Sequence, residues 1–103
     1  AATGNVKPLC FTELGYLTGE GYPSLAATAP NFAWANDTTI AQQAEWLAEA
    51  ARLSRDQGKV RLLIVFNVDF TTYDADPQAG YALIRADGTC PACDTLGAVM
   101  ATP

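Results

Sequence analysis

Residues 39–68 read TIAQQAEWLAEAARLSRDQGKVRLLIVFNV, a pattern that predicts an α-helix followed by a β-strand. Thr39 and Gln42 have the spacing of a helix-capping box, and Gly58 is the residue type that ends helices in the left-handed conformation. Between these signals, apolar and polar side chains fall on opposite stripes of a helix. The apolar stripe comprises Ile40, Ala44, Leu47 and Ala51, and the polar stripe comprises Gln42, Glu45, Glu49, Arg52 and Asp56.

A second strand is predicted before this helix. Residues 9–16, LCFTELGY, are apolar and aromatic, and Pro8 precedes them. The almost wholly apolar run at residues 60–68 is typical of a strand that is buried on both faces, as in a parallel sheet. Strand, helix and strand at this spacing form a βαβ unit with a right-handed crossover. A last helix is expected to begin at Pro91 and to run to about Met100.

Composition narrows the function classes. The chain has 103 residues, half of them hydrophobic, which suits one small globular domain. Its net charge of -5 and its scattered Lys and Arg residues argue against a nucleic-acid partner. No apolar run reaches the roughly 18 to 20 residues of a membrane span. The absence of His excludes a Ser-His-Asp triad, a Cys-His pair and most zinc sites within the chain. Any acid–base or nucleophilic chemistry must therefore use carboxylates, Tyr, Lys or Cys.

Glu13 is an acid in the middle of the first predicted strand. Burial of an unpaired charge costs several kcal/mol or shifts the pKa of the group, so an acid in an apolar strand is expected to be paired or used. Regular alternation would place Phe11 and Glu13 on the same face. Glu13 also lies near the carboxyl end of the strand, where parallel α/β proteins bind ligands. Two interpretations remain: a functional carboxylate, or a rim carboxylate in an ordinary salt bridge.

The second strand ends in a similar way. Its apolar run closes with Phe66, Asn67 and Asp69. Because neighbouring parallel strands end at the same edge of a sheet, these side chains are expected at the same rim as Glu13. Residues 17–36 form a long segment between the first strand and the helix, and loops of that length in compact domains are usually functional.

Four segments resemble the last two βα units of a clan-A glycoside hydrolase barrel. They are TELGY at residues 12–16, QQAEWL at 42–47, FNVDF at 66–70 and GYALIRADGTCPAC at 80–93. The last of these resembles the run that closes such barrels before their final helix. The resemblance implies that residues 1–103 are a single partial domain of the α/β class, a parallel βαβα fragment of a TIM (β/α)₈ barrel.

The resemblance also implies a reaction. In that family the acid on the seventh strand is the nucleophile of retaining hydrolysis, and it maps onto Glu13. A second carboxylic acid, about 5 to 5.5 Å away, protonates the leaving oxygen. The aromatic floor under the sugar maps approximately onto Phe66, although Trp is more usual there. The remaining residues expected to contact or support a carbohydrate substrate are Tyr16, Trp34, Asn67 and Asp69.

The second acid is the missing part. In the family it comes from the fourth strand, usually in an Asn-Glu pair, and this chain has no such pair. The chain alone is therefore expected to be inactive, and an upstream barrel segment or self-association is needed to complete the fold. The resemblance implies no cofactor and no metal, and it slightly favours an extracellular location. A non-catalytic carbohydrate-binding or structural remnant of the barrel is the alternative.

Cys90 and Cys93 form a Cys-Pro-Ala-Cys motif at the predicted start of the last helix. This spacing occurs in redox proteins, so a small redox protein is a further alternative. The motif follows an Asp-Gly turn and not a strand, which favours structural thiols or a local disulfide. A zinc site would need a further ligand, and Cys10 in the first strand is not expected to reach the motif.

Overall fold

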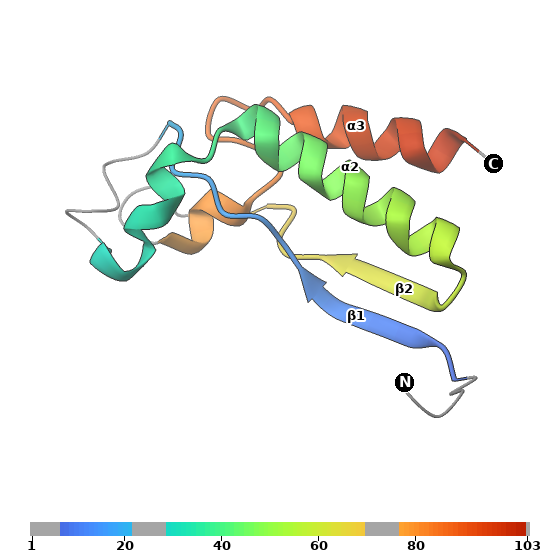
Figure 1. The fold of residues 1–103 in the computed structure, drawn as a ribbon. Helices are drawn as coiled ribbons and strands as arrows, with labels where there is room; N and C mark the ends of the chain where they lie inside the picture. Colours follow the sequence, from blue (N-terminus) through green and yellow to red (C-terminus); the bar gives the residue numbers. More distant parts are fainter. Residues whose placement is uncertain (1–6, 22–28, 70–76, 103) are drawn as a thin grey trace.

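The computed structural model describes residues 7–21, 29–69 and 77–102, and its fold is mixed α/β with a two-stranded parallel sheet (Figure 1). The two strands lie side by side, and their carboxyl ends are directed toward the part of the molecule that holds the two 3₁₀ helices. Two α-helices cover one face of the sheet. The elements in chain order are strand β1 (Leu9–Leu14), 3₁₀ helix η1 (Pro30–Asp37), helix α2 (Ile40–Gln57), strand β2 (Val60–Val65), 3₁₀ helix η2 (Pro77–Tyr81) and helix α3 (Pro91–Ala101).

Helix α2 begins and ends where its sequence signals predict. The Thr39 side chain accepts a hydrogen bond from the Gln42 backbone N–H at 3.0 Å, and Gln42 Oε1 accepts one from the Thr39 N–H at 2.9 Å. These two bonds complete the predicted capping box. Gly58 adopts a φ of 78° as the C-cap, a conformation that glycine reaches without a steric cost.

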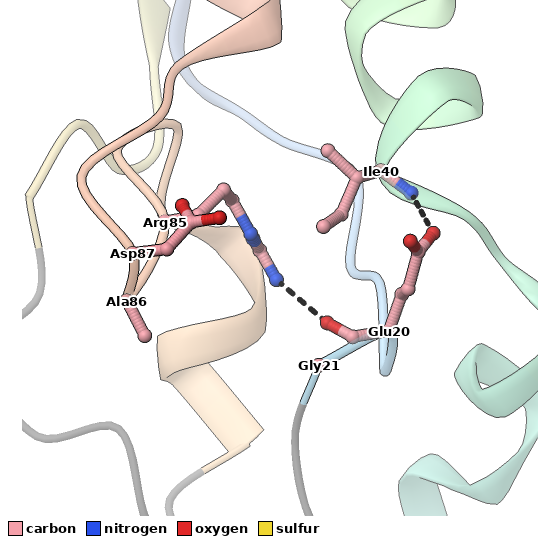
Figure 2. A pocket seen from close by; sticks show the side chains of 6 residues that line it. All are labelled: Glu20, Gly21, Ile40, Arg85, Ala86 and Asp87. Carbon is pink, nitrogen blue, oxygen red and sulfur yellow. Dashed lines mark hydrogen bonds between the residues drawn. The ribbon is translucent and has the colours of Figure 1, made fainter.

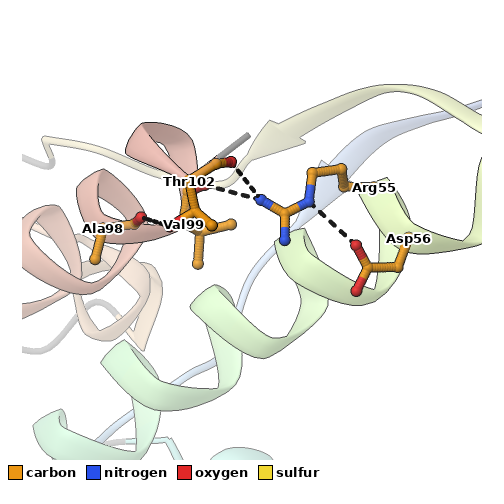
Figure 3. A network of polar contacts seen from close by, with 5 residues as sticks. All are labelled: Arg55, Asp56, Ala98, Val99 and Thr102. Atoms are coloured by element: carbon orange, nitrogen blue, oxygen red, sulfur yellow. Dashed lines mark hydrogen bonds and ion pairs between the residues drawn. The ribbon is translucent and has the colours of Figure 1, made fainter.

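The main core lies between the two α-helices and the sheet. Ala44 and Leu47 of α2 are buried there, which confirms the centre of the predicted apolar stripe. Beyond the core, Arg55 near the end of α2 donates hydrogen bonds to the backbone oxygens of Val99 (3.0 Å) and Thr102 (2.8 Å), so it ties the two helix ends together (Figure 3). The core cluster consists of Ala44, Leu47, Leu83 and Ala92, with Leu14, Val65 and Leu96 among the residues packed against it.

The prediction that residues 60–68 are buried on both faces is wrong. Strand β2 ends at Val65, and Leu62 and Ile64 keep 48% and 46% of their surface exposed. A parallel strand becomes buried on both faces only when further layers cover both sides of its sheet. Here α2 and α3 cover one side, and no other described element covers the second.

Strand β1 also departs from regular alternation. Its register against β2 shifts between Phe11 and Leu14. Phe11 lines a hollow together with Leu53 and Gln57 of α2, whereas Glu13 lines a separate cavity. The two side chains therefore do not line a common cavity, and the register shift between Phe11 and Leu14 interrupts the regular alternation from which a common face is expected.

Helix α3 starts at Pro91, as predicted, and its N-cap residue is Cys90. Proline suits this position because the missing N–H would have no helical partner there. None of the helices in the described ranges is both long and apolar enough to cross a membrane.

Candidate functional site

Glu13 is exposed and lines an open cavity of about 380 Å³ at the carboxyl end of the sheet, so the expectation that burial forces its charge to be paired does not apply. The cavity gathers residues from the ends of both strands and from both 3₁₀ helices, which the topology brings to the same edge. Its lining residues are Glu13, Gly15, Phe32, Phe66, Gln78 and Tyr81. Two predicted site residues, Glu13 and Phe66, are thus brought together here.

Three aromatic rings give the cavity an apolar wall. Phe66 and Tyr81 pack edge to face, with ring centroids 5.5 Å apart and planes inclined by 68°. Phe32 and Tyr81 both pack against a small cluster formed by Leu17 and Ala35, which holds η1 against the strand exit. Aromatic rings can pack on the apolar C–H faces of a ligand while a neighbouring carboxylate accepts hydrogen bonds from its hydroxyls.

Gly15 allows the two strand ends to approach closely at the cavity. A Cβ atom at this position would lie 2.1 Å from the backbone oxygen of Phe66 and 3.0 Å from the Tyr81 ring. Immediately before it, the Phe66 N–H donates to the Leu14 oxygen at 2.8 Å. A side chain at position 15 would therefore separate Glu13 from the aromatic wall.

Gln43 is a residue that the sequence analysis missed. Its side chain is buried, and Nε2 donates to the backbone oxygens of Tyr16 (2.9 Å), Gly80 (3.1 Å) and Tyr81 (3.4 Å). One amide thus joins the exit of β1 to η2, which carries Tyr81. The spacing of Gln43 in the sequence indicates this burial. Gln43 is three residues after Ile40 and four before Leu47, so it lies on the side of the helix that faces the core.

Arg85 has a similar role at the outer edge of the site. It is buried, and it donates to the backbone oxygens of Ala82 (2.8 Å), Gly80 (3.3 Å) and Glu20 (3.2 Å). The Glu20 carboxylate in turn accepts the Ile40 N–H at 2.8 Å, at the start of α2, where negative charge is favoured (Figure 2). These bonds link the loop after β1 to the segments before α2 and α3. A small cavity of about 130 Å³ lies between them.

The other predicted site residues lie outside the cavity lining. The Tyr16 ring packs edge to face on Trp46 of α2, with centroids 5.6 Å apart, and contacts the main core. Trp34 of η1 is 61% exposed, and Asp69 is exposed after β2. Asn67 Nδ2 donates to the Gln78 backbone oxygen at 3.2 Å, while its Oδ1 is buried and has no hydrogen-bond partner among the described residues.

The three cysteines occupy two different environments. Cys90 and Cys93 form a disulfide with their Cα atoms 5.3 Å apart, which is one of the two states that the sequence left open, structural thiols or a local disulfide. Cys10 is a free, exposed thiol on β1. Across residues 7–21, 29–69 and 77–102, no three His, Cys, Asp or Glu side chains are grouped in a way that could hold a metal ion.

Comparisons with known proteins add no relatives. No protein-family model matches the chain, and neither does any curated protein or solved structure. A functional assignment therefore depends on the site itself, an aromatic cavity with one carboxylate at the carboxyl end of a parallel sheet.

Proposed function

We propose that the chain is the C-terminal portion of a retaining glycoside hydrolase with a TIM-barrel fold, in which Glu13 is the nucleophile. One observation carries this proposal: Glu13 lies at the carboxyl end of a parallel strand, in a cavity that also contains Phe66 and Tyr81. Ligands of parallel α/β folds bind at this end of the sheet. The resemblance of residues 12–16 and 80–93 to such hydrolases supports the same assignment.

The open sheet supports a larger parent fold. Strands β1 and β2 form the only sheet among the described residues, and Leu62 and Ile64 on β2 are half exposed. In a closed barrel, neighbouring strands would pair with both edges and cover such side chains. An upstream barrel segment or a second copy of the chain would supply that cover.

The proposed reaction has two steps, and Glu13 acts in both. In the first, a carboxylate oxygen of Glu13 attacks the anomeric carbon, and the glycosidic C–O bond breaks as a second acid donates its proton to the leaving oxygen. In the second, water attacks the same carbon and frees Glu13, while the second residue takes the proton of the water. Phe66 and Tyr81 provide the apolar surface on which the sugar ring rests. Glu13 is the only acid among the described residues that line the cavity, so none of these lining residues is the proposed proton donor.

The test uses a longer chain that includes the upstream barrel. Glu13→Ala should lower glycoside cleavage by about 10⁴-fold or more, because the attacking atom is lost. External azide should restore part of the turnover and yield a glycosyl azide. Glu45→Ala removes an equivalent, exposed carboxylate from α2 and should leave the activity unchanged. Full activity of Glu13→Ala would show that Glu13 is not the nucleophile.

A non-catalytic carbohydrate-binding role is the second candidate, and the single cavity carboxylate favours it for the isolated chain. A lone carboxylate can accept hydrogen bonds from hydroxyls, but a retaining hydrolase needs two carboxyl groups. The upstream sequence separates the two roles. An Asn-Glu pair at the end of an earlier strand supports the enzyme, and its absence supports the binding role.

A further inference from the structure

The Glu13 cavity has an unbalanced charge. Among its described lining residues, Glu13 is the only charged side chain, and the rest are Gly15, Gln78 and the three aromatic rings. No Lys or Arg lines the cavity in the part of the chain that the structure describes. A ligand in it would therefore meet one negative charge and three aromatic rings.

The cations of the chain lie elsewhere. All six Lys and Arg residues belong to the described ranges. Five of them lie before β1, in the second half of α2, in the connection between α2 and β2, or at the start of β2. These segments are at the opposite end of the sheet from Glu13 (Figure 1). The sixth, Arg85, directs its guanidinium to the backbone oxygens of Gly80, Ala82 and Glu20. The five distant cations are Lys7, Arg52, Arg55, Lys59 and Arg61.

Acidic side chains accumulate at the end that holds the cavity. Asp37 ends η1, Asp69 follows β2, and Glu20 and Asp87 lie on the loops beside the small cavity of Figure 2. The chain is therefore polarised along its strands, with negative charge at the carboxyl end. Such a distribution attracts cations to that end and repels anions from it.

We propose that the Glu13 cavity selects sugars that carry a protonated amine over neutral sugars, and that it disfavours uronic acids. An ammonium group in the cavity would pair with the Glu13 carboxylate and could also lie over the face of Phe66 or Tyr81. A uronate would bring a second negative charge beside Glu13. The inference rests on the proposed function only in taking a sugar as the ligand, because the charge preference belongs to the cavity itself.

Binding of three matched probes to the 103-residue chain tests the preference. The probes are the methyl glycosides of glucosamine, glucose and glucuronic acid, titrated at low salt and at a slightly acidic pH that keeps the amine protonated. NMR signals of Gly15 and Tyr81 report occupancy of the cavity. The glucosaminide should bind about three- to tenfold more tightly than the glucoside, and the glucuronide should bind more weakly than either. Added salt at about 1 M should reduce these differences, because it screens exposed charges.

Two variants locate the source of the selectivity. Glu13→Gln should remove most of the preference for the glucosaminide, since only the aromatic contribution remains. Asp56→Asn removes the same charge from the far end of α2 and should leave the preference intact. Equal effects of the two variants, equal affinities for the three glycosides or binding of none of them would overturn the inference.

The experiments can contradict the charge preference and the proposed hydrolase function independently. A charge preference that survives in a chain whose longer form cleaves no glycoside would contradict the hydrolase assignment alone. Indifference to ligand charge in a form that does cleave glycosides would contradict this inference alone.

Discussion

Gln43 Nε2 lies 2.9 Å from the backbone oxygen of Tyr16, 27 positions earlier in the chain. The same nitrogen reaches the Gly80 oxygen at 3.1 Å. Tyr16 follows Glu13 by three residues, and Gly80 immediately precedes Tyr81. Two walls of the cavity, one from β1 and one from η2, are thus joined through a single buried amide of α2.

Replacement of this amide should destabilise the protein. Gln43→Leu keeps a similar volume but removes the donor to the Tyr16 oxygen. The Gly80 oxygen, in contrast, still accepts hydrogen bonds from the Thr18 N–H and from Arg85. A buried acceptor without a partner costs about 1 to 3 kcal/mol, so the free energy of unfolding should fall by that amount. Urea denaturation measures it. Gln57→Leu, the same change at an exposed site on α2, should shift it by less than about 0.5 kcal/mol.

Two glycines should respond in opposite directions to alanine. Gly15→Ala would place Cβ against the Phe66 oxygen, so the strand ends must separate, and we expect a loss of about 1 to 3 kcal/mol of stability. Gly97 lies within α3 with open space around its Cβ position, and Gly97→Ala should stabilise the helix by about 0.8 to 1 kcal/mol. Thermal unfolding of both variants checks the contrast. Equal changes in stability for the two variants would show that the close approach at Gly15 does not affect the stability of the protein.

The elements that sequence predicted best are those with local causes. Thr39, Gln42 and Gly58 act through bonds and dihedral angles within a few residues of themselves, so the limits of α2 could be read directly. The exposure of Leu62 and Ile64 could not be read in this way. Their apolar character is encoded locally, but their burial depends on which other layers the chain supplies.

The candidate site could be predicted only in part, because some of its residues are placed by the strand order and others by how distant elements pack. The ends of two adjacent parallel strands must meet at one edge, so Glu13 and Phe66 were expected together. The register shift in β1 and the contributions of Tyr81 and Gln43 depend on how η2 and α2 pack, which no short motif encodes. Tyr16 follows the strand but packs its ring on Trp46, because the side chain turns toward the helix.

The disulfide between Cys90 and Cys93 should contribute modestly to stability. It closes a very short loop at the start of α3, for which the chain-entropy model gives about 2 kcal/mol. Reduction should lower the free energy of unfolding by about that amount, as measured by urea denaturation with and without reductant. Cys10→Ser should leave this difference unchanged, because Cys10 is exposed and unbonded. In the Cys90→Ser/Cys93→Ser variant the effect of reductant should vanish.

The same cysteine pair tests the redox alternative. A redox protein must cycle its pair between dithiol and disulfide with a thiol partner. Thiol titration before and after exposure to a reduced dithiol, and again after reoxidation, measures this cycling. A pair that does not cycle excludes the redox role, and rapid, reversible exchange would favour it over the glycoside hydrolase.

The turn before α3 should give the protein a measurable acid-side pH dependence. The Asp87 carboxylate accepts hydrogen bonds from the side chain of Thr89 (2.6 Å) and from its backbone N–H (2.9 Å). These bonds hold the pKa of Asp87 below its usual value of 3.8 in the folded state. A depressed folded-state pKa stabilises the native state above the unfolded pKa, and this contribution is lost as pH falls through the folded pKa. Stability should therefore fall below about pH 3.8, and Asp87→Asn should remove this component.

Side-chain carboxyl ¹³C titration by NMR measures the pKa of Asp87 directly. Thr89→Val removes the hydroxyl donor, so the pKa should rise toward 3.8, while Thr89→Ser keeps both donors and should preserve the depressed value. A pKa of Asp87 at or above 3.8 in the unaltered chain would contradict the prediction. Because Asp87 is exposed, added salt weakens its attraction to Arg85 but leaves the two short bonds from Thr89 in place. The depression should therefore persist at high salt, which separates local hydrogen bonding from long-range charge as its cause.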